Sequence, residues 1–173
     1  MRIDKDEYYL QMAELVASRS TCLRRAVGCV LTNARGHVLA TGHNGRPAGW
    51  PHCNEVTNID VNHPAVPDVH GHACAGLFRT DGKRPHRSGT NLDACEAIHA
   101  EQNALLQCRD AYVIETCYVT VSPCVTCVKL LLNTSCRRVV FRVPYAHDVA
   151  AEQLWINEHA LVSGEPRSWI CLR

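Results

Sequence analysis

The chain has 173 residues, with 18 Lys and Arg against 17 Asp and Glu, which gives a formal net charge of +1 at pH 7. This length suits one domain with a single core. The balanced charge argues against an extended nucleic-acid surface, and no apolar run of about 18 residues or more could cross a bilayer. The charged N-terminus lacks the apolar segment of a signal peptide, so a soluble cytoplasmic protein is expected.

Eleven cysteines and ten histidines are the unusual feature of the composition. An odd number of cysteines without a secretory signal favours free thiols and metal ligands over a disulfide framework. Some cysteines nevertheless lie in strand-like runs and are expected to act as small buried hydrophobic residues. These are Cys29, Cys117, Cys136 and Cys171.

The hydrophobic pattern predicts helices that alternate with strands. Asp4 and Glu7 resemble a capping box, which predicts a first helix that ends near Arg19. A turn composition at 33–36 predicts a β-hairpin. Helices that alternate with β-branched strands indicate an α/β sandwich around one sheet. Strands are expected at 27–32, 37–41, 116–121 and 138–143, helices at 96–109, 124–132 and 148–158, and a short tail at 169–171.

Two irregular segments interrupt this pattern. The glycine- and proline-rich loop at 42–49 is permissive enough to bring its backbone close to a ligand. The segment at about 50–94 has no periodicity but is rich in Cys and His, so a metal ion is expected to hold it. Disorder is the alternative, although disordered segments are rarely rich in these residues. A single domain over 1–173 with an irregular zinc-stapled insertion is therefore predicted.

Two short motifs carry the chemistry: His99-Ala100-Glu101, and Pro123 followed by Cys124 and Cys127. Each is expected at the start of a helix, and together they match the signature of zinc-dependent nucleobase deaminases. A catalytic zinc needs about three protein ligands and one open position for water. His99, Cys124 and Cys127 are the predicted ligands, and the helix N-termini favour thiolates at the two cysteines.

Glu101 is displaced around the helix from His99, so it is better placed to touch the bound water than the metal. The hypothesis is that zinc lowers the pKa of the water and that Glu101 accepts its proton as hydroxide attacks C4 of a cytosine. Glu101 then protonates N3 and the departing amine, giving uracil and ammonia. The alternatives are a chance His-x-Glu, and half of a zinc knuckle or a redox pair at Cys124 and Cys127.

Longer segments around these motifs resemble the deoxycytidylate (dCMP) deaminase family of the cytidine deaminase superfamily. The resemblance implies a three-layer α/β/α sandwich around a mixed five-stranded sheet, and a hydrolase that converts dCMP to dUMP and ammonia. It also implies a homo-oligomer, such as a hexamer, and magnesium-assisted activation by dCTP with inhibition by dTTP. The segments that carry it are 20–28, 42–49, 52–55, 99–105 and 122–127.

The family's Gly-Tyr-Asn-Gly loop contributes to nucleotide binding. In this chain His43 stands where Tyr is usual, and Asn44 is the candidate for a contact with a sugar hydroxyl. A nucleotide phosphate also needs cationic groups near the pocket. Tyr145 is the candidate to close the pocket over the base, with packing as the alternative. The candidates for the phosphate are Arg24, Arg25 and Arg46.

Family members often carry a second, structural zinc. The candidate ligands here are Cys22, Cys53, Cys74 and Cys95, with a neighbouring histidine as a possible replacement for one of them. The histidines considered are His52, His70, His72 and His86. The alternative is that Cys74 and Cys95 are buried thiols without a metal.

Other functions remain open at this stage. The same chemistry on dCTP, a 5-modified dCMP, a free nucleoside or cytosine in a nucleic acid is one class of alternative. Near-neutral charge and few aromatic residues disfavour the nucleic-acid substrate. A zinc-stabilised binding module without turnover is the other class, but it has no need of an unligated carboxylate such as Glu101.

Overall fold

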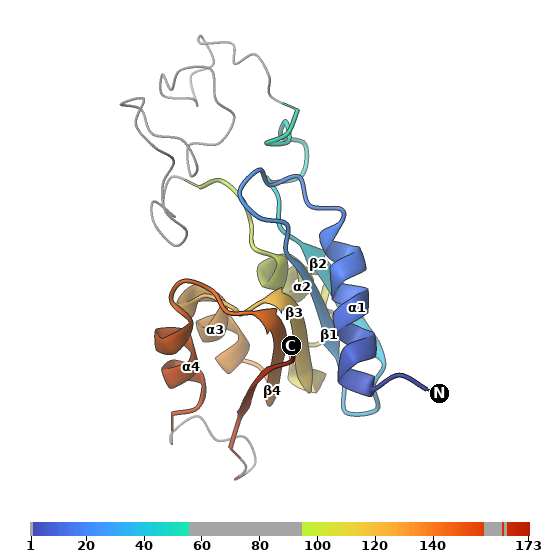
Figure 1. The fold of residues 1–173 in the computed structure, drawn as a ribbon, viewed down its shortest axis with the longest axis vertical. Helices are drawn as coiled ribbons and strands as arrows, with labels where there is room; N and C mark the ends of the chain where they lie inside the picture. The colour runs from blue at the N-terminus through green and yellow to red at the C-terminus, as the bar shows by residue number, and fades with distance from the viewer. Residues whose placement is uncertain (1, 56–94, 158–163, 165) are drawn as a thin grey trace.

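The computed structural model describes residues 2–55, 95–157, 164 and 166–173, which form one sheet covered by helices (Figure 1). The strands are β1 (Gly28–Thr32), β2 (Val38–His43), β3 (Thr116–Val121), β4 (Arg138–Val143) and β5 (Ser168–Cys171). The helices are α1 (Lys5–Ala17), α2 (Ala100–Gln107), α3 (Val125–Leu132) and α4 (Asp148–Trp155), with a short 3-10 helix at Ala111–Val113. Within this described part, no helix is long and apolar enough to span a bilayer.

The sheet is mixed, as predicted, with the strand order β2-β1-β3-β4-β5. β1 pairs antiparallel with both β2 and β3, whereas β4 lies parallel between β3 and β5. α3 and α4 follow β3 and β4 in the chain, and such crossover helices are the usual connection between parallel strands. The carboxyl end of β3 therefore leads directly into α3, which carries one of the two motifs.

Helices cover both faces of this sheet. α1 lies on one face, while α2, α3 and α4 lie on the other (Figure 1). Successive strand residues point to opposite faces, and the two hydrophobic cores follow that alternation. Val30, Tyr118 and Val140 pack with α1, whereas Leu31, Val119 and other inward residues pack with the remaining helices. The predicted three-layer sandwich is thus confirmed.

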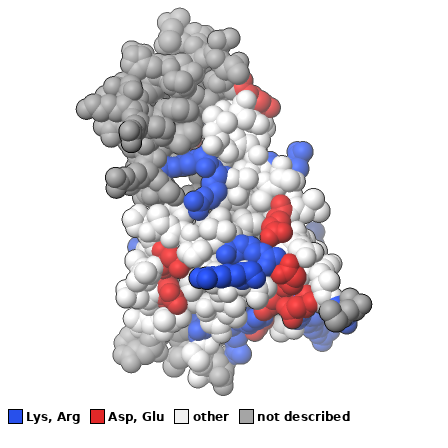
Figure 2. All heavy atoms as spheres, in the orientation of Figure 1, with Lys and Arg blue, Asp and Glu red and all other residues white. Residues whose placement is uncertain are grey.

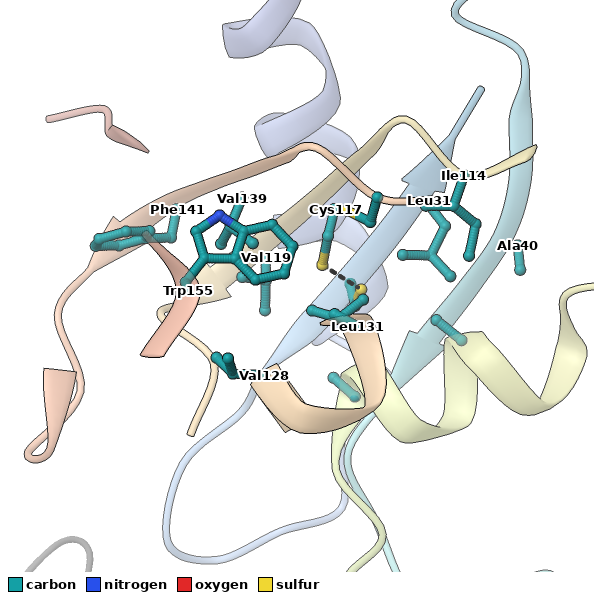
Figure 3. Close-up of a cluster of buried hydrophobic side chains, with 14 of the residues drawn as sticks. Leu31, Ala40, Ile114, Cys117, Val119, Val128, Leu131, Val139, Phe141 and Trp155 are labelled. Atoms are coloured by element: carbon teal, nitrogen blue, oxygen red, sulfur yellow. Dashed lines mark hydrogen bonds between the residues drawn. The ribbon is translucent and has the colours of Figure 1, made fainter. Parts of the chain in front are cut away.

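The larger core contains cysteines as well as aliphatic and aromatic side chains (Figure 3). Cys29, Cys117 and Cys136 have no exposed surface, so the prediction that they are buried is confirmed. Cys29 Sγ and Cys117 Sγ lie 3.6 Å apart on neighbouring strands. The corresponding prediction for Cys171 was wrong, because Cys171 ends β5 at the edge of the sheet and is exposed.

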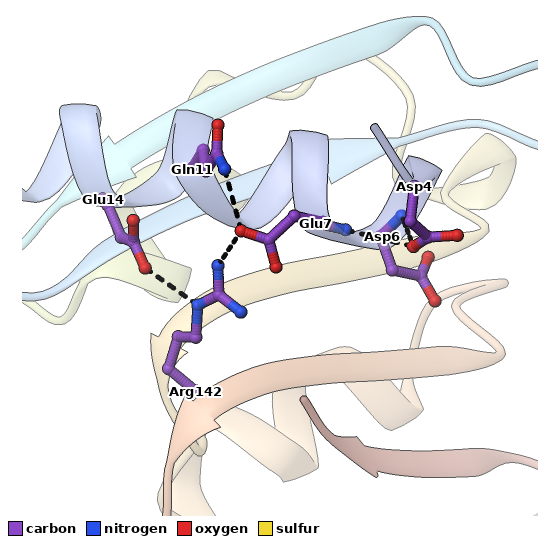
Figure 4. Close-up of polar contacts among 6 residues, drawn as sticks. All are labelled: Asp4, Asp6, Glu7, Gln11, Glu14 and Arg142. Atoms are coloured by element: carbon purple, nitrogen blue, oxygen red, sulfur yellow. Dashed lines mark hydrogen bonds and ion pairs between the residues drawn. The ribbon is translucent and has the colours of Figure 1, made fainter. Parts of the chain in front are cut away.

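The first helix begins where the sequence predicts. The Asp4 carboxylate accepts hydrogen bonds from the backbone N–H groups of Asp6 and Glu7, which stabilises the exposed N-terminus of α1. Glu7 does not complete a capping box; its carboxylate instead accepts hydrogen bonds from Gln11 and Arg142 (Figure 4). Arg142 belongs to β4, so the ion pair between Arg142 and Glu7 connects α1 to the sheet.

Several element boundaries differ from the sequence prediction. The helix expected from residue 96 begins at Ala100, because Ile98 is extended and forms an isolated bridge with Gly45. The tail expected at 169–171 is the strand β5, which pairs with β4. That strand is only four residues long, and its pairing with a strand far along the chain is not visible as a local pattern. The first helix ends at Ala17 rather than near Arg19.

Two glycines allow helices to approach the sheet closely. A Cβ on Gly28 of β1 would lie 3.0 Å from Ala17 Cα and closer still to the backbone of Ala13 in α1. A Cβ on Gly42 of β2 would lie 3.0 Å from Ala104 Cα and closer still to the carbonyl oxygen of Ala100 in α2. α2 therefore rests directly on the backbone of β2, which fixes the position of the helix that follows His99.

Candidate active site

His99, Cys124 and Cys127 come together at the N-terminal ends of two helices. His99 immediately precedes α2, Cys124 immediately precedes α3, and Cys127 lies in the first turn of α3. His99 Nδ1 lies 3.5 Å from Cys124 Sγ and 3.4 Å from Cys127 Sγ. In the described part of the chain, this is the one group of three or more His, Cys, Asp or Glu residues whose ligand atoms lie within 4.8 Å of one another.

The geometry of these three residues fits a tetrahedral zinc ion. Zinc binds an imidazole nitrogen at about 2.0 Å and a thiolate sulfur at about 2.3 Å, so at a tetrahedral angle the two ligand atoms lie about 3.5 Å apart. The observed separations of 3.5 and 3.4 Å agree with that value. Three protein ligands would leave the fourth position for water.

The two thiols are chemically suited to hold a cation. The hydrogen bond with Cys127 lowers the pKa of Cys124 to about 4, and the hydrogen bond with His99 acts in the same direction. The same pairing, together with burial, raises the pKa of Cys127. One thiolate therefore forms readily, and a divalent cation between the sulfurs favours ionisation of both.

Glu101 lies in the first turn of α2, beside the three candidate ligands, and only 4% of its surface is exposed. Burial raises the pKa of Glu101 to about 7, although the charge of His99 acts against this effect. A carboxyl group with a pKa near neutrality can both accept and release a proton at physiological pH. Glu101 lines the same cavity as His99 and Cys124, so it can reach a molecule bound there.

Backbone contacts that the sequence did not reveal hold the two motifs in place. Gln102 Oε1 accepts a hydrogen bond of 2.8 Å from the His99 N–H. Ser122 Oγ accepts one of 2.8 Å from the Tyr145 N–H, at the point where the chain leaves β4. Both residues lie within the family-like segments, but their partners could not be identified from spacing alone.

A cavity of about 300 Å³ opens at this end of the sheet, above the candidate metal ligands. Its size suits a small organic ligand. Six of its residues were singled out from the sequence as possible nucleotide or second-metal contacts outside the two motifs. The lining comprises Cys22, Arg24, Arg25, Val27, Asn44, Cys95, Ala97, His99, Ala100, Glu101, Val121, Ser122, Cys124 and Tyr145.

Arg24 and Arg25 give the cavity a cationic rim. The Arg25 guanidinium lies 6.0 Å from the centre of the Tyr145 ring. Two residues that were each predicted to contact the nucleotide therefore lie close together. Arg25 Nη1 is buried and has no hydrogen-bond partner among the described residues. On the face shown in Figure 2, basic side chains lie next to acidic ones rather than forming a continuous basic surface. Two neighbouring arginines in the lining of one cavity are suited to a local anion site.

Asn44 lines the cavity, but its side chain also binds the neighbouring backbone. Its Nδ2 donates to the Arg25 carbonyl oxygen at 2.8 Å, and its Oδ1 accepts from the Val27 N–H at 2.8 Å. Asn44 directly follows β2 and is buried, and its amide holds the backbone beside Arg25. The predicted sugar contact is compatible with its position in the lining.

Arg46 lies elsewhere. It is absent from the cavity lining, and its guanidinium forms an ion pair with Glu96 and donates a hydrogen bond of 3.0 Å to the Pro51 carbonyl oxygen. It also lies over the Trp50 ring, 5.3 Å from the ring centre. Arg46 therefore ties the loop after β2 to the segment before α2, rather than pointing into the cavity.

The candidate ligands of a second zinc are only partly described. Cys22 and Cys95 line the cavity and Cys53 is buried, but Cys74 lies outside the described residues. His52 Nδ1 lies 3.4 Å from Thr21 Oγ1, while His70, His72 and His86 also lie outside the described residues. In the described part, none of these residues joins a group of three close ligands. The second zinc stays a prediction.

Together, the fold and the site define a class of protein. A mixed α/β/α sandwich that presents one histidine, two cysteines and a buried glutamate at adjoining helix N-termini has the arrangement of a zinc-dependent hydrolytic deaminase. The sequence profile described as "Cytidine and deoxycytidylate deaminase zinc-binding region" matches residues 3–143. The chain belongs to this family of zinc-binding deaminases.

Individual relatives agree with this assignment. The chain is 38% identical to the deoxycytidylate deaminase of Mycobacterium phage D29 over 141 residues, covering 81% of this chain and 95% of the phage protein. It is 34% identical to the deoxycytidylate deaminase of Schizosaccharomyces pombe over 145 residues, covering 83% of this chain. The match spans only 38% of that yeast protein, so the chain corresponds to well under half of its length.

A solved structure extends the likeness to three dimensions. The crystal structure of dCMP deaminase from the cyanophage S-TIM5, in complex with dCMP and dUMP, superposes with a TM-score of 0.59 at 25% sequence identity. The alignment covers 89% of this chain and 94% of the cyanophage chain. The mixed sheet and its flanking helices therefore have the same fold as that cyanophage enzyme.

Proposed function

We propose that this protein catalyses the hydrolytic deamination of dCMP to dUMP and ammonia. The observation that carries the proposal is the position of Glu101, a buried carboxyl group that shares a cavity with His99 and Cys124. A purely structural metal site has no use for such a carboxyl group. The names of the phage and yeast relatives, and the dCMP and dUMP bound to the cyanophage enzyme, support the choice of substrate.

His99, Cys124 and Cys127 are the residues that would hold the zinc ion. When bound there, zinc supplies the Lewis acidity that lowers the pKa of a water molecule towards neutrality. The protein's own contribution is to hold the imidazole and both sulfurs at tetrahedral separations, on two helices that rest against the same sheet. Little rearrangement is then needed when the ion binds.

Glu101 moves the protons. It accepts a proton from the attacking water while the oxygen forms a bond to C4 of the cytosine ring, and it passes that proton to N3. The second proton of the water goes by way of Glu101 to the exocyclic amine, whose bond to C4 then breaks. One water is consumed, and dUMP and ammonia leave. A pKa of about 7 suits a group that must be charged at the start and neutral midway.

The rest of the cavity would hold the nucleotide. Arg25, and Arg24 beside it, would pair with the 5′-phosphate, because guanidinium groups bind phosphate oxygens through directed hydrogen bonds. Asn44 would contact the deoxyribose, and Tyr145 would close over the base. These roles agree with the cavity lining and with the buried Nη1 of Arg25.

Further properties follow only from the family resemblance. A homo-oligomer, a second zinc at Cys22, Cys53, Cys74 and Cys95, and magnesium-assisted regulation by dCTP and dTTP stay predictions. The cytoplasmic location, which is expected from the charged N-terminus rather than from the resemblance, also stays a prediction. Each can be measured on the purified protein or in cells without affecting the proposal for the catalytic centre.

The proposal is tested by ammonia release from a panel of deoxycytidine, dCMP, dCTP and 5-methyl-dCMP, each with and without dCTP or dTTP as effector. The expected result is the highest kcat/KM for dCMP, with activity lost after metal chelation and restored by zinc. A clear preference for dCTP or 5-methyl-dCMP would keep the chemistry and change the substrate. No release from any of these compounds would reject the proposal.

A further inference from the structure

We infer that Ser20, together with Asn44, positions the backbone segment that presents the phosphate-binding arginines, so that recognition of the 5′-phosphate depends on a serine outside the cavity. The inference rests on the proposed function, because it assigns a residue that acts through Arg25 on the same substrate. It concerns the segment between α1 and β1, which lacks helix or strand structure of its own.

Asn44 is the centre of this arrangement. Its amide makes hydrogen bonds on both sides of Ala26: Nδ2 donates to the Arg25 carbonyl oxygen at 2.8 Å, and Oδ1 accepts from the Val27 N–H at 2.8 Å. The backbone adds a third contact of 3.1 Å, from the Asn44 N–H to the Val27 carbonyl oxygen. The peptide groups next to Arg25 are therefore fixed by one buried side chain from the end of β2.

Ser20 fixes the orientation of that amide. Its hydroxyl donates to Asn44 Oδ1 at 2.7 Å and lies 3.0 Å from the Asn44 carbonyl oxygen. The same hydroxyl oxygen accepts a hydrogen bond of 3.2 Å from the Cys22 N–H. A donor at Oδ1 requires that the oxygen, and not the amide nitrogen, faces Ser20 and Val27. Without the Ser20 hydroxyl, the Asn44 amide loses one hydrogen bond and the Cys22 N–H loses another.

The hydrogen bonds of Ser20 and Asn44 would affect ligand binding through Arg25. Its side chain reaches the cavity and lies over the Tyr145 ring, and its Nη1 is buried without a hydrogen-bond partner among the described residues. A buried guanidinium nitrogen of this kind is costly unless an anion binds to it. The position of the guanidinium follows from its backbone, and the backbone is held by Asn44 and Ser20. Ser20 does not line the cavity, so it acts as a positioning residue.

The test compares Ser20→Ala with Ser18→Ala in the full-length, zinc-loaded protein. Ser18 is a matched control, because its hydroxyl donates only to the Leu15 carbonyl oxygen of its own helix, at 2.6 Å, and it is exposed. For Ser20→Ala we expect KM for dCMP and Kd for dUMP to rise about fivefold, the effect of one lost hydrogen bond. The Kd of deoxyuridine, which lacks the phosphate but keeps the deoxyribose that Asn44 would contact, rises by a smaller factor than that of dUMP. Ser18→Ala changes none of these constants.

A second experiment, in a variant that lacks the Arg25 guanidinium, distinguishes the positioning of Arg25 from a general destabilisation of the protein. In Arg25→Gln protein, Ser20→Ala is expected to cause a smaller loss of dUMP affinity than in wild type, because the main group that Ser20 positions is already absent. Equal losses for dUMP and deoxyuridine, or a full fivefold effect in the Arg25→Gln background, would overturn the inference. If wild-type protein neither binds dUMP nor deaminates dCMP, the proposed function itself fails. If wild type does both and Ser20→Ala behaves like wild type, only this inference fails.

Discussion

Gly42 of β2 and Ala104 of α2 are in direct backbone contact: a Cβ added to Gly42 would lie 3.0 Å from Ala104 Cα. The Ala100 carbonyl oxygen and the Ala104 nitrogen would lie closer still, so no side chain fits without displacing the helix. α2 carries Glu101 and follows directly after His99. The position of the proposed catalytic group therefore depends on the absence of one methyl group.

Gly42→Ala is expected to displace α2 and to lower kcat/KM for dCMP at least about tenfold, because displacements of about 1 Å can cost a hundredfold in rate. Gly28→Ala is the matched control, since its Cβ would displace α1 instead. That variant should lose about 1–3 kcal/mol of stability, as overpacked sites do, while its folded fraction keeps the wild-type kcat, because α2 is not displaced. Steady-state kinetics and urea unfolding of both variants measure the contrast. Equal loss of activity in the two variants would contradict the assignment of Gly42.

A second network fastens α1 to the sheet. Asp6 accepts hydrogen bonds from Tyr118 at 2.8 Å and from Arg138 at 2.6 Å. Burial alone would raise the pKa of Asp6, but the hydrogen bonds from Arg138 and Tyr118 lower it below its ordinary value of 3.8. A lowered pKa in the folded state means that this stabilisation is present above pH 3.8 and is lost as the pH falls through the folded pKa.

Asp6→Asn is therefore expected to destabilise the protein by about 1–3 kcal/mol at pH 7, the cost of charged hydrogen bonds between partly buried groups. The difference from wild type should shrink as the pH falls below 3.8. Glu14→Gln serves as the control: its bond to Arg142 is exposed, and loss of such a pair changes stability by about 0.5 kcal/mol. Chemical unfolding between pH 2.5 and 7 supplies the measurement. A constant Asp6→Asn difference over that range would disprove the linkage.

Glu101 is expected to affect the pH dependence of stability in the opposite direction from Asp6. In metal-free protein its pKa of about 7 lies above the ordinary 4.5, so folding favours the protonated form. Its contribution is fully present below pH 4.5 and is lost as the pH rises through 7. The metal-free Glu101→Gln variant should therefore gain stability over wild type between pH 5 and 8, by about 3 kcal/mol at the upper end. Urea unfolding in the presence of a chelator measures it, and a pH-independent difference would refute the buried, neutral carboxyl.

The cysteines of the core should resist alkylation. Burial raises the pKa of Cys29 and of Cys136, and the hydrogen bond with Cys29 raises that of Cys117. Iodoacetamide, which reacts with thiolates, should modify the exposed Cys171 in folded protein and spare these three residues until urea is added. Peptide mass spectrometry reads out each site. Equal labelling of Cys117 and Cys171 under native conditions is the contrary result.

The features that could be predicted from the sequence are those formed by residues close together in the chain. His99 and Glu101 are two residues apart, and Cys124 and Cys127 are three apart, so helical geometry alone brings each pair to one helix start. The mixed sheet and its two helical layers were likewise predicted, in part from periodicity and in part from the family resemblance. Even the N-cap at Asp4 was visible, because its hydrogen bonds are to its own neighbours.

Contacts between distant segments were not predictable in the same way. Ser20 and Asn44 are 24 residues apart, and Arg46 and Glu96 are 50 apart, so no local pattern links them. The sequence shows that Arg46 is a cation in a loop. Its ion pair with Glu96 and its hydrogen bond to Pro51 form only when the fold brings these residues together. The exposed position of Cys171 likewise depends on the strand order of the whole sheet.

The central claim is that Glu101 moves protons at a metal held by His99, Cys124 and Cys127. The most direct measurement is zinc content and dCMP turnover, determined together for wild type, Glu101→Gln and Cys124→Ala. The account predicts that Glu101→Gln keeps the zinc that Cys124→Ala loses, while its kcat falls by about 10²–10⁴ or more, the usual range for general acid–base catalysis. A Glu101→Gln protein that retains zinc and turns over dCMP at the wild-type rate would contradict it.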